Sequence, residues 1–177
     1  MDFEAFPKMA RLSREIIITE KLDGTNAQIC ISEDGSFLVG SRNRWITPDN
    51  DNFGFARWAY DNKDELMQLG HGRHFGEWWG QGIQRNYGMD RKTFSLFNVS
   101  RWGDERPACC DVVPTLYRGM FSQEAIDAAL DDLRDNGSKA AQGFMKPEGI
   151  IFYHCAAGIG FKKTLEKDEV PKSVSGL

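Results

Sequence analysis

Charged residues that can act on a phosphate group recur at the ends of predicted strands. Lys21-Leu-Asp-Gly24 follows a β-branched run, Phe75-Gly-Glu-Trp78 ends another strand, and Pro147-Glu-Gly-Ile150 begins a third. A lysine amine is a nucleophile once its proton is removed, and carboxylates can bind a metal ion. Alone, a lysine at a strand end is typical of an exposed surface. The interpretation therefore depends on the whole set of residues.

Short strands predominate among the elements that must position these residues. Alternating or β-branched patterns predict strands over 15–20, 26–32, 37–41, 73–79, 92–99, 112–117, 149–154 and 158–163. Asp34-Gly35 indicates a hairpin turn, and 43–52 is expected to be a loop. Apolar spacing predicts helices over 53–69 and 122–136, the second capped by Ser122 and stopped at Gly137. This pattern predicts an α+β fold with a largely antiparallel sheet.

Length and charge restrict the class of protein. The 177 residues suit one domain, 1–177, and residues 165–177 are expected to form a polar tail. A net charge of −4 argues against general coating of nucleic acid, so any such contact requires a local patch. We expect no membrane span and no secretory signal. The four cysteines are expected to be reduced thiols of a cytoplasmic protein.

The order of the motifs along the chain carries a family resemblance. Lys21-Leu-Asp-Gly-Thr-Asn26, then Arg42, the Gly-Glu pair at Glu77, the aromatic strand ending at Phe97, the Glu-Gly pair at Glu148 and a final lysine pair appear in sequence. This order resembles the covalent nucleotidyltransferase superfamily of DNA ligases, RNA ligases and capping enzymes, with the Lys-x-Asp-Gly-x-Asn form closer to ATP-dependent RNA ligases. The resemblance implies a nucleotidyltransferase fold (the ATP-grasp-like ligase adenylation fold), mainly antiparallel sheets flanked by a few helices.

The resemblance also implies a reaction and a role for each matching residue. ATP would be the co-substrate, with Mg²⁺ or Mn²⁺, and the product would be a lysyl-AMP whose AMP passes to a 5′-phosphate RNA end for joining to a 3′-hydroxyl. The implied roles are nucleophile for Lys21, orienting carboxylate for Asp23, close backbone approach for Gly24, nucleotide contact for Arg42, ribose contact for Glu77, adenine contacts for Phe97 and Ile151, metal ligand for Glu148, and α-phosphate contact for Lys162.

Two features depart from the usual family pattern. Lys162 and Lys163 are adjacent, and strand alternation lets only one of them face the site; we expect Lys162, with Lys163 on the opposite face. Only 14 residues follow Lys163, too few for an OB-fold domain. We therefore expect a minimal form of the family, in which a partner protein could replace the missing C-terminal domain.

Other readings remain open from the sequence. RNA contacts are expected at Asn26 of the motif and at Arg73 and Arg85. These two arginines belong to a basic stretch, 71–92, that also includes Arg91 and Lys92; the alternative surface lies near the N-terminus. A zinc site at His71, His74 and the adjacent cysteines has poor ligand spacing. The alternatives to an RNA ligase are a DNA-ligase-like or guanylyltransferase-like enzyme, and a non-catalytic module that binds a nucleotide or a nucleic-acid end.

Overall fold

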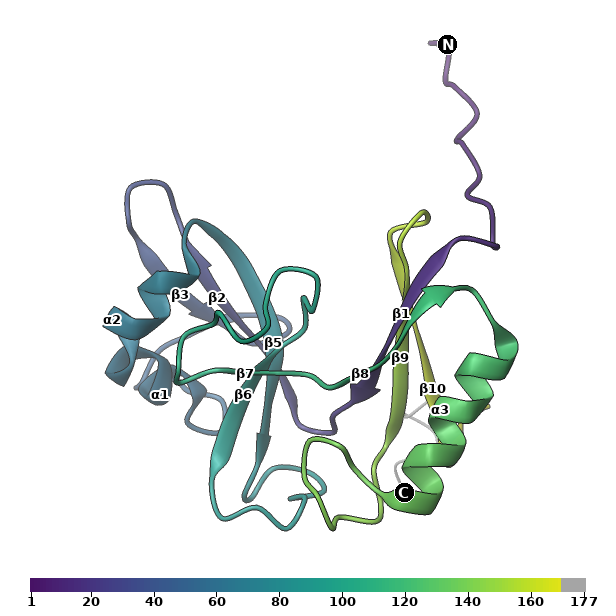
Figure 1. Cartoon of the computed structure of the whole chain (residues 1–177). Coiled ribbons are helices and arrows are strands. Elements are labelled where there is room, and N and C mark those ends of the chain that lie inside the picture. The colour runs from purple at the N-terminus through teal and green to yellow at the C-terminus, as the bar shows by residue number, and fades with distance from the viewer. Residues whose placement is uncertain (170–177) are drawn as a thin grey trace.

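Two β-sheets stand face to face, and each carries helices on its outer side (Figure 1). The structure is a computed structural model that describes residues 1–169, so residues 170–177 of the expected polar tail lie outside the described residues. Its mixed architecture, with mostly antiparallel strand pairs, confirms the predicted α+β class. Among the described residues, no helix is long and apolar enough to cross a membrane.

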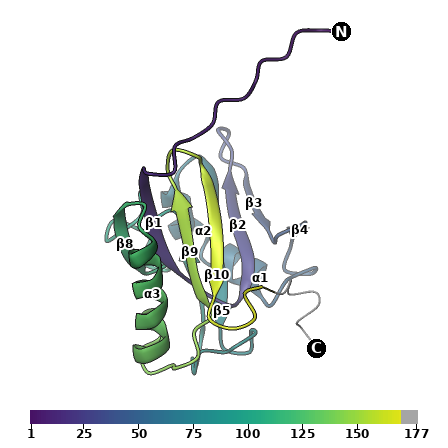
Figure 2. The ribbon, with the colours of Figure 1, turned by 90° about the vertical axis from the view of Figure 1, so that its right-hand side faces the viewer.

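The first sheet has four antiparallel strands in the order β10-β9-β1-β8. They are β1 (Glu15–Lys21), β8 (Thr115–Met120), β9 (Gly149–His154) and β10 (Ile159–Thr164). Helix α3 (Gln123–Asn136) packs its apolar stripe, including Ile126, Leu130 and Leu133, against Ile16, Ile18 and Ile150 of this sheet. Figure 2 shows α3 lying along the strands on that side. As predicted, the Ser122 hydroxyl caps α3 by accepting from Ala125 N–H, and Gly137 follows the last turn with φ of 83°.

The second sheet has six strands in the order β4-β3-β2-β5-β6-β7. They are β2 (Thr25–Ile31), β3 (Phe37–Gly40), β4 (Trp45–Ile46), β5 (Gly72–Gly80), β6 (Lys92–Leu96) and β7 (Asp111–Val112). Its pairs are antiparallel except β6 with β7, which is parallel. Its outer face packs on α1 (Phe55–Asp61) and α2 (Lys63–Leu66), in a core that buries Phe55, Trp78 and Phe94. Trp58 is partly buried and packs against this core.

The chain passes between the two sheets at two short crossovers. One is 22–24, from β1 to β2, and the other is 113–114, from β7 to β8. Leu22 and Val113, one from each crossover, are buried in the same small cluster with Trp79, Tyr87 and Ala141. This third cluster therefore joins the sheets where the chain connects them.

The single helix predicted over 53–69 is wrong. The segment forms α1, α2 and a 3-10 turn, η1 (Met67–Leu69). Gly54, with φ of 77°, precedes the first helical turn. At Asn62 the backbone leaves the helical region (φ −107°, ψ 18°), and its side-chain amide donates to Trp58 O at 2.8 Å, which ends α1. The apolar spacing continued through this break because all the short helices face the same core.

Two strand predictions and one loop prediction also differ from the structure. The strand expected over 112–117 is two strands, β7 and β8, because Pro114 has no N–H to continue a ladder. The strand expected over 92–99 ends at Leu96, and the Asn98 carboxamide then accepts from Ser100 and Arg101 N–H in a turn. The loop expected over 43–52 contains the short edge strand β4.

Candidate active site

Lys21 is the last residue of β1 and lies on the uncovered face of the four-stranded sheet. Side chains alternate along a strand, and Ile16, Ile18 and Glu20 point toward α3, so Thr19 and Lys21 point the other way. We call this the inner face of the sheet, since the six-stranded sheet also turns its uncovered face toward it (Figure 1). The candidate nucleophile therefore lies between the sheets, next to the first crossover.

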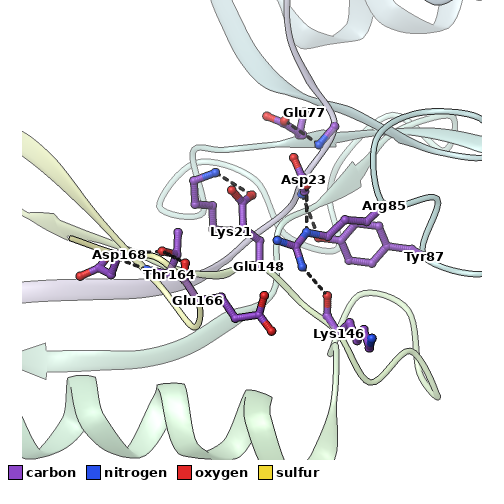
Figure 3. Close-up of polar contacts among 11 residues, drawn as sticks. Lys21, Asp23, Glu77, Arg85, Tyr87, Lys146, Glu148, Thr164, Glu166 and Asp168 are labelled. Atoms are coloured by element: carbon purple, nitrogen blue, oxygen red, sulfur yellow. Dashed lines mark hydrogen bonds and ion pairs between the residues drawn. The ribbon is translucent and has the colours of Figure 1, made fainter. Parts of the chain in front are cut away.

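An ion pair joins Lys21 to the residue before β9. Lys21 Nζ lies 2.7 Å from Glu148 Oε2, and the Glu148 side chain is only 7% exposed (Figure 3). The sheet register places Lys21 opposite Gly149, the next residue. A Cβ on Gly149 would lie 2.2 Å from Lys163 O, so glycine is needed for β9 and β10 to approach here. The Glu-Gly pair thus brings its carboxylate to the amine and lets the strands close.

Glu77, on β5, binds the backbone beside the lysine. Gly24 N–H donates to Glu77 Oε1 at 3.1 Å. A Cβ on Gly24 would lie 2.3 Å from Trp78 O, so glycine allows this close contact between the β1–β2 crossover and β5. Burial raises the pKa of Glu77 to about 7, against the opposing effects of the Gly24 N–H and the Lys21 charge. The Glu148 and Asp23 carboxylates raise this pKa further, so the three acids share one electrostatic environment.

Asp23 is bound by two residues of the segment between β5 and β6. Arg85 Nε lies 2.9 Å from Asp23 Oδ2, and Arg85 Nη1 donates to Lys146 O at 3.0 Å (Figure 3). Asp23 N–H donates to the Tyr87 hydroxyl at 2.8 Å, and burial raises the pKa of that hydroxyl. Arg85, predicted to contact RNA, therefore links the crossover to the residues preceding Glu148.

Glu20 anchors the segment that leads to Glu148. Its side chain, on the α3 side of β1, accepts from the Ser138 hydroxyl at 2.6 Å and from the Lys139 and Ala140 N–H groups at 2.8 and 3.0 Å. The residue is 1% exposed, and burial raises the pKa of its carboxyl. Glu20 and Tyr87 were not among the site residues predicted from the sequence. A glutamate at the end of a strand is common at protein surfaces, and Tyr87 lies in a glycine-rich connection with no motif, so neither residue type indicated a role in the site.

The register of β10 separates the two adjacent lysines. Lys162 is opposite Ile151, which is opposite Thr19, so these residues share the inner face with Lys21. Lys163 is opposite Ile150, which packs toward α3, so it lies on the outer face. Lys162 is exposed and Lys163 is half-buried.

The remaining predicted residues lie on or beside the six-stranded sheet. Asn26 is opposite Glu77, and Phe97, 38% exposed, follows β6 opposite Phe75, so both belong to the inner face. Arg73 lies four residues before Glu77 on β5, about 13 Å away along the strand. Arg42 is exposed in the turn after β3. The structure thus gathers Lys21, Asp23, Gly24, Glu77 and Glu148 closely and sets Arg42 and Arg73 apart.

The donor set suits magnesium or manganese better than zinc. Residues 1–169 contain no group of three or more His, Cys, Asp or Glu side chains that could hold a metal ion. His74 Nε2 is 2.8 Å from Gly70 O and the His74 ring packs edge-on to Trp102. The imidazole is therefore held by these two residues rather than in the zinc site considered for His71, His74 and the adjacent cysteines. Mg²⁺ binds one or two carboxylates together with substrate phosphates and water, and Glu148, beside Lys21, is the carboxylate for which the sequence predicted this role.

A cavity of about 200 Å³ adjoins the acid of the ion pair. Its lining includes Arg85, Arg134, Lys146, Glu148 and Glu166. Because Arg85 is paired with Asp23 and Arg134 with Asp131, most of this cationic charge is already balanced, and Lys21 does not line the cavity. A larger cavity, about 370 Å³, lies by Trp79, Ser95, Arg106 and Lys139, and neither Lys21 nor Glu148 lines it.

Comparison with solved structures supports the fold. A Naegleria gruberi RNA ligase mutant with ATP and Mn matches with a TM-score of 0.64, 22% identity and coverage of 85% of this chain and 48% of that chain. A second mutant with AMP and Mn gives a TM-score of 0.64 and 22% identity, covering 85% and 49%. The same ligase with PPi gives 0.62 and 21%, covering 86% and 50%. The chain spans about half the length of these structures.

Sequence comparison gives two further results. A search of curated proteins finds no match. The RNA ligase family, in contrast, matches residues 14–167, which include every motif from Lys21 to the lysine pair on β10. The chain therefore belongs to the RNA ligase family.

Proposed function

We propose that this chain is an ATP-dependent RNA ligase that forms a covalent lysyl-AMP at Lys21. The observation that carries the proposal is the arrangement of Lys21 with Glu148 at 2.7 Å and with the Glu77-bound Gly24 backbone beside it. The matched Naegleria ligase structures contain ATP, AMP or PPi; ATP is the reactant of such a step, AMP corresponds to the group transferred, and PPi is the leaving group. Family membership and site geometry thus support the same chemistry.

The first reaction transfers an adenylyl group to the lysine. The Lys21 amine loses its proton and attacks the α-phosphorus of ATP, a P–N bond forms, and the bond to the β-phosphate breaks to release pyrophosphate. Lys162, on the same inner face, is proposed to neutralise charge on the α-phosphate, and Glu77 to hold the ribose. Phe97 and Ile151, on facing sheets, are proposed to contact the adenine. A divalent metal bound by Glu148 would offset phosphate charge.

The later steps join RNA ends. The 5′-phosphate of an RNA attacks the adenylyl phosphorus and the P–N bond breaks, and a 3′-hydroxyl then attacks the activated 5′ end and releases AMP. Because the matched ligases are about twice as long as the part this chain covers, we propose that sealing also uses a further domain or a partner protein. A cytoplasmic location is proposed because the cysteines among the described residues are free thiols.

Labelling with radioactive ATP tests the proposal. The protein is incubated with α-labelled ATP and Mg²⁺ or Mn²⁺ and then run on a denaturing gel. We expect a labelled band in the wild type, a lost band in Lys21→Ala, and weak bands in Glu77→Ala and Glu148→Ala. Label retained by Lys21→Ala would exclude the proposed nucleophile.

The same assay separates the two competing functions. Preferential labelling by GTP would favour the guanylyltransferase-like reading. Absence of any label, with measurable binding of ATP, would favour a non-catalytic module. Adenylylated RNA and joined product, measured with 5′-phosphorylated RNA and DNA strands, identify the nucleic acid that is sealed.

A further inference from the structure

Exposed aromatic rings lie in one row across the inner face of the six-stranded sheet. The register pairs Trp45 with Gly40, Gly40 with Gln28 and Gln28 with Phe75. Phe97 continues the row, since its N–H donates to Phe75 O. The row therefore crosses five neighbouring chain segments. It lies beside the row formed by Asn26, Glu77 and Ser95.

The rings of this row are open to solvent. Trp45 is 49% exposed and Phe75 is 45% exposed, although large apolar side chains on a sheet are normally buried. Leu38, on the same face in the next row, is 45% exposed. Helices α1 and α2 pack on the opposite face of this sheet. Strand β1 of the other sheet lies apart from β4, the edge strand that carries Trp45, in both views (Figures 1 and 2).

The flat amide of Gln28 lies between Trp45 and Phe75 in the row. Gly40 has no side chain, and a Cβ there would lie 2.9 Å from Cγ of Gln28. The Gln28 side chain therefore takes this space, and its amide donates to Ser41 O at 3.2 Å. The Gln28 amide oxygen accepts from the Cys30 thiol at 3.3 Å, so the amide is held in place between the aromatic rings, and rings and amide together form flat surfaces on which bases can stack.

Arginines border the row. The Arg73 guanidinium lies 5.8 Å from the centre of the Trp45 ring. Arg42 and Arg44 lie exposed in the turn between Gly40 and Trp45, and the Arg44 guanidinium donates to Asn50 O and Asp51 O at 3.0 and 2.9 Å. This local positive rim contrasts with the net charge of −4 of the whole chain, so it supplies the cationic patch that phosphate contacts require.

We propose that Leu38, Trp45, Arg73 and Phe75 form an aromatic platform that binds unpaired nucleotides of a single-stranded RNA. This inference rests on the proposed function for the identity of the nucleic acid, RNA. It adds that the RNA is bound as an unpaired single strand. Bases stack on Trp45 and Phe75, and phosphates contact the arginines. A protein partner is disfavoured because the apolar side chains are interrupted by Gln28 and bordered by three arginines, whereas strand faces with aromatic rings suit base stacking.

Binding of a labelled RNA tests the platform without requiring any catalysis. Fluorescence anisotropy is measured with a short 5′-phosphorylated single-stranded RNA and with the same RNA in a blunt duplex. We expect Trp45→Ala to weaken single-strand binding about 10-fold or more and Trp45→Phe to restore most of it. Tyr60→Ala is the matched control, because Tyr60 is 37% exposed on α1, on the opposite side of the sheet. It should bind as wild type.

Salt dependence tests the charged rim. Arg73→Gln should lower the slope of log affinity against log salt by about 0.7, the value for one phosphate contact on a single strand. Arg57→Gln, on exposed α1, should leave the slope unchanged.

Three results would overturn the inference. They are unchanged RNA affinity in Trp45→Ala, stronger binding of the duplex than of the single strand, and a wild-type dimer in sedimentation that Trp45→Ala dissociates, since a second copy would then cover the face. The ATP-labelling assay, run on the same samples, keeps the two proposals apart. Trp45-dependent RNA binding in a protein that fails to label would retain the platform and reject the lysyl-AMP.

Discussion

Lys21 Nζ and Glu148 Oε2 lie 2.7 Å apart although 127 residues separate the two in the chain. The ion pair joins the end of β1 to the start of β9, next to the half-buried Glu77 carboxylate on β5. Sheet pairing, rather than closeness in sequence, therefore assembles the candidate site. It also ties the position of the amine to an acid that a metal would share.

The first prediction concerns the strength of this pair. Because Glu148 is nearly buried and Lys21 partly so, a double-mutant cycle of Lys21→Met and Glu148→Gln should show a coupling energy of about 1–2 kcal/mol. Urea unfolding of the four proteins at neutral pH provides the measurement. The exposed Arg134–Asp131 pair is the control, with an expected coupling below about 0.5 kcal/mol. Equal couplings at the two sites would show that the Lys21 pair is not buried in solution.

The second prediction concerns Glu77 and pH. Its pKa is raised from 4.5 to about 7 in the folded state, so the unfolded chain releases this proton first as pH rises. Glu77 therefore lowers the free energy of unfolding progressively between about pH 4.5 and 7, and the loss stays constant above that window. Glu77→Gln, which can still accept from Gly24, should be more stable than wild type above pH 7 by up to about 3 kcal/mol.

Urea titrations below pH 4.5 and above pH 7 check this prediction, with no difference expected at the low end. A constant difference across the range would mean that Glu77 is not desolvated. Glu124→Gln on exposed α3 provides a control for removing one carboxylate, and its stability profile should follow the wild type.

The third prediction concerns Arg85 as a link between Asp23 and Lys146 O. Arg85→Lys keeps the charge but loses the forked donors, so it should destabilise the fold by about 1–2 kcal/mol. It should also slow self-labelling with ATP about 10-fold or more, because Glu148 and the crossover are less well positioned. Single-turnover labelling measures the rate. Normal labelling with weaker RNA binding would instead support the direct RNA contact expected from the sequence.

The fourth prediction concerns the glycine of the Lys-x-Asp-Gly motif. Gly24→Ala would place a methyl group 2.3 Å from Trp78 O, so β5 and the crossover must separate. We expect a loss of about 2 kcal/mol or more in stability together with loss of ATP labelling. Gly103→Ala, where no atom lies within 4 Å of the added carbon, should remain close to wild type. Thermal unfolding of both variants distinguishes the clash from a general effect of replacing glycine.

Local patterns were enough to predict the strands that carry the motifs. The β-branched run before Lys21 and the Asp34-Gly35 turn each gave a strand boundary close to the observed one. Alternation along β10 also identified which lysine shares the face of Lys21. These features depend on neighbours in sequence, because side chains on one face repeat every two residues in a strand and about every 3.6 residues in a helix.

Contacts that depend on loop geometry could not be read from such patterns. Asp23 and Arg85 are 62 residues apart in the chain. The loop that contains Arg85 has positive φ angles at Gln84, Asn86 and Tyr87, and these residue types do not by themselves predict such angles. Glu20 and Ser138 are 118 residues apart and meet only after α3 docks. The helix break at Asn62 was also hidden, because the apolar residues on both sides face one core.

The two crossovers, 22–24 and 113–114, are the segments at which the chain connects the sheets, and the cluster that contains Leu22 and Val113 fixes both at one junction. A displacement of one sheet relative to the other about this junction would move Lys21, which adjoins it, less than Trp45, which lies on the edge strand β4. We therefore expect the separation of the sheets to vary more at Trp45 than at Lys21.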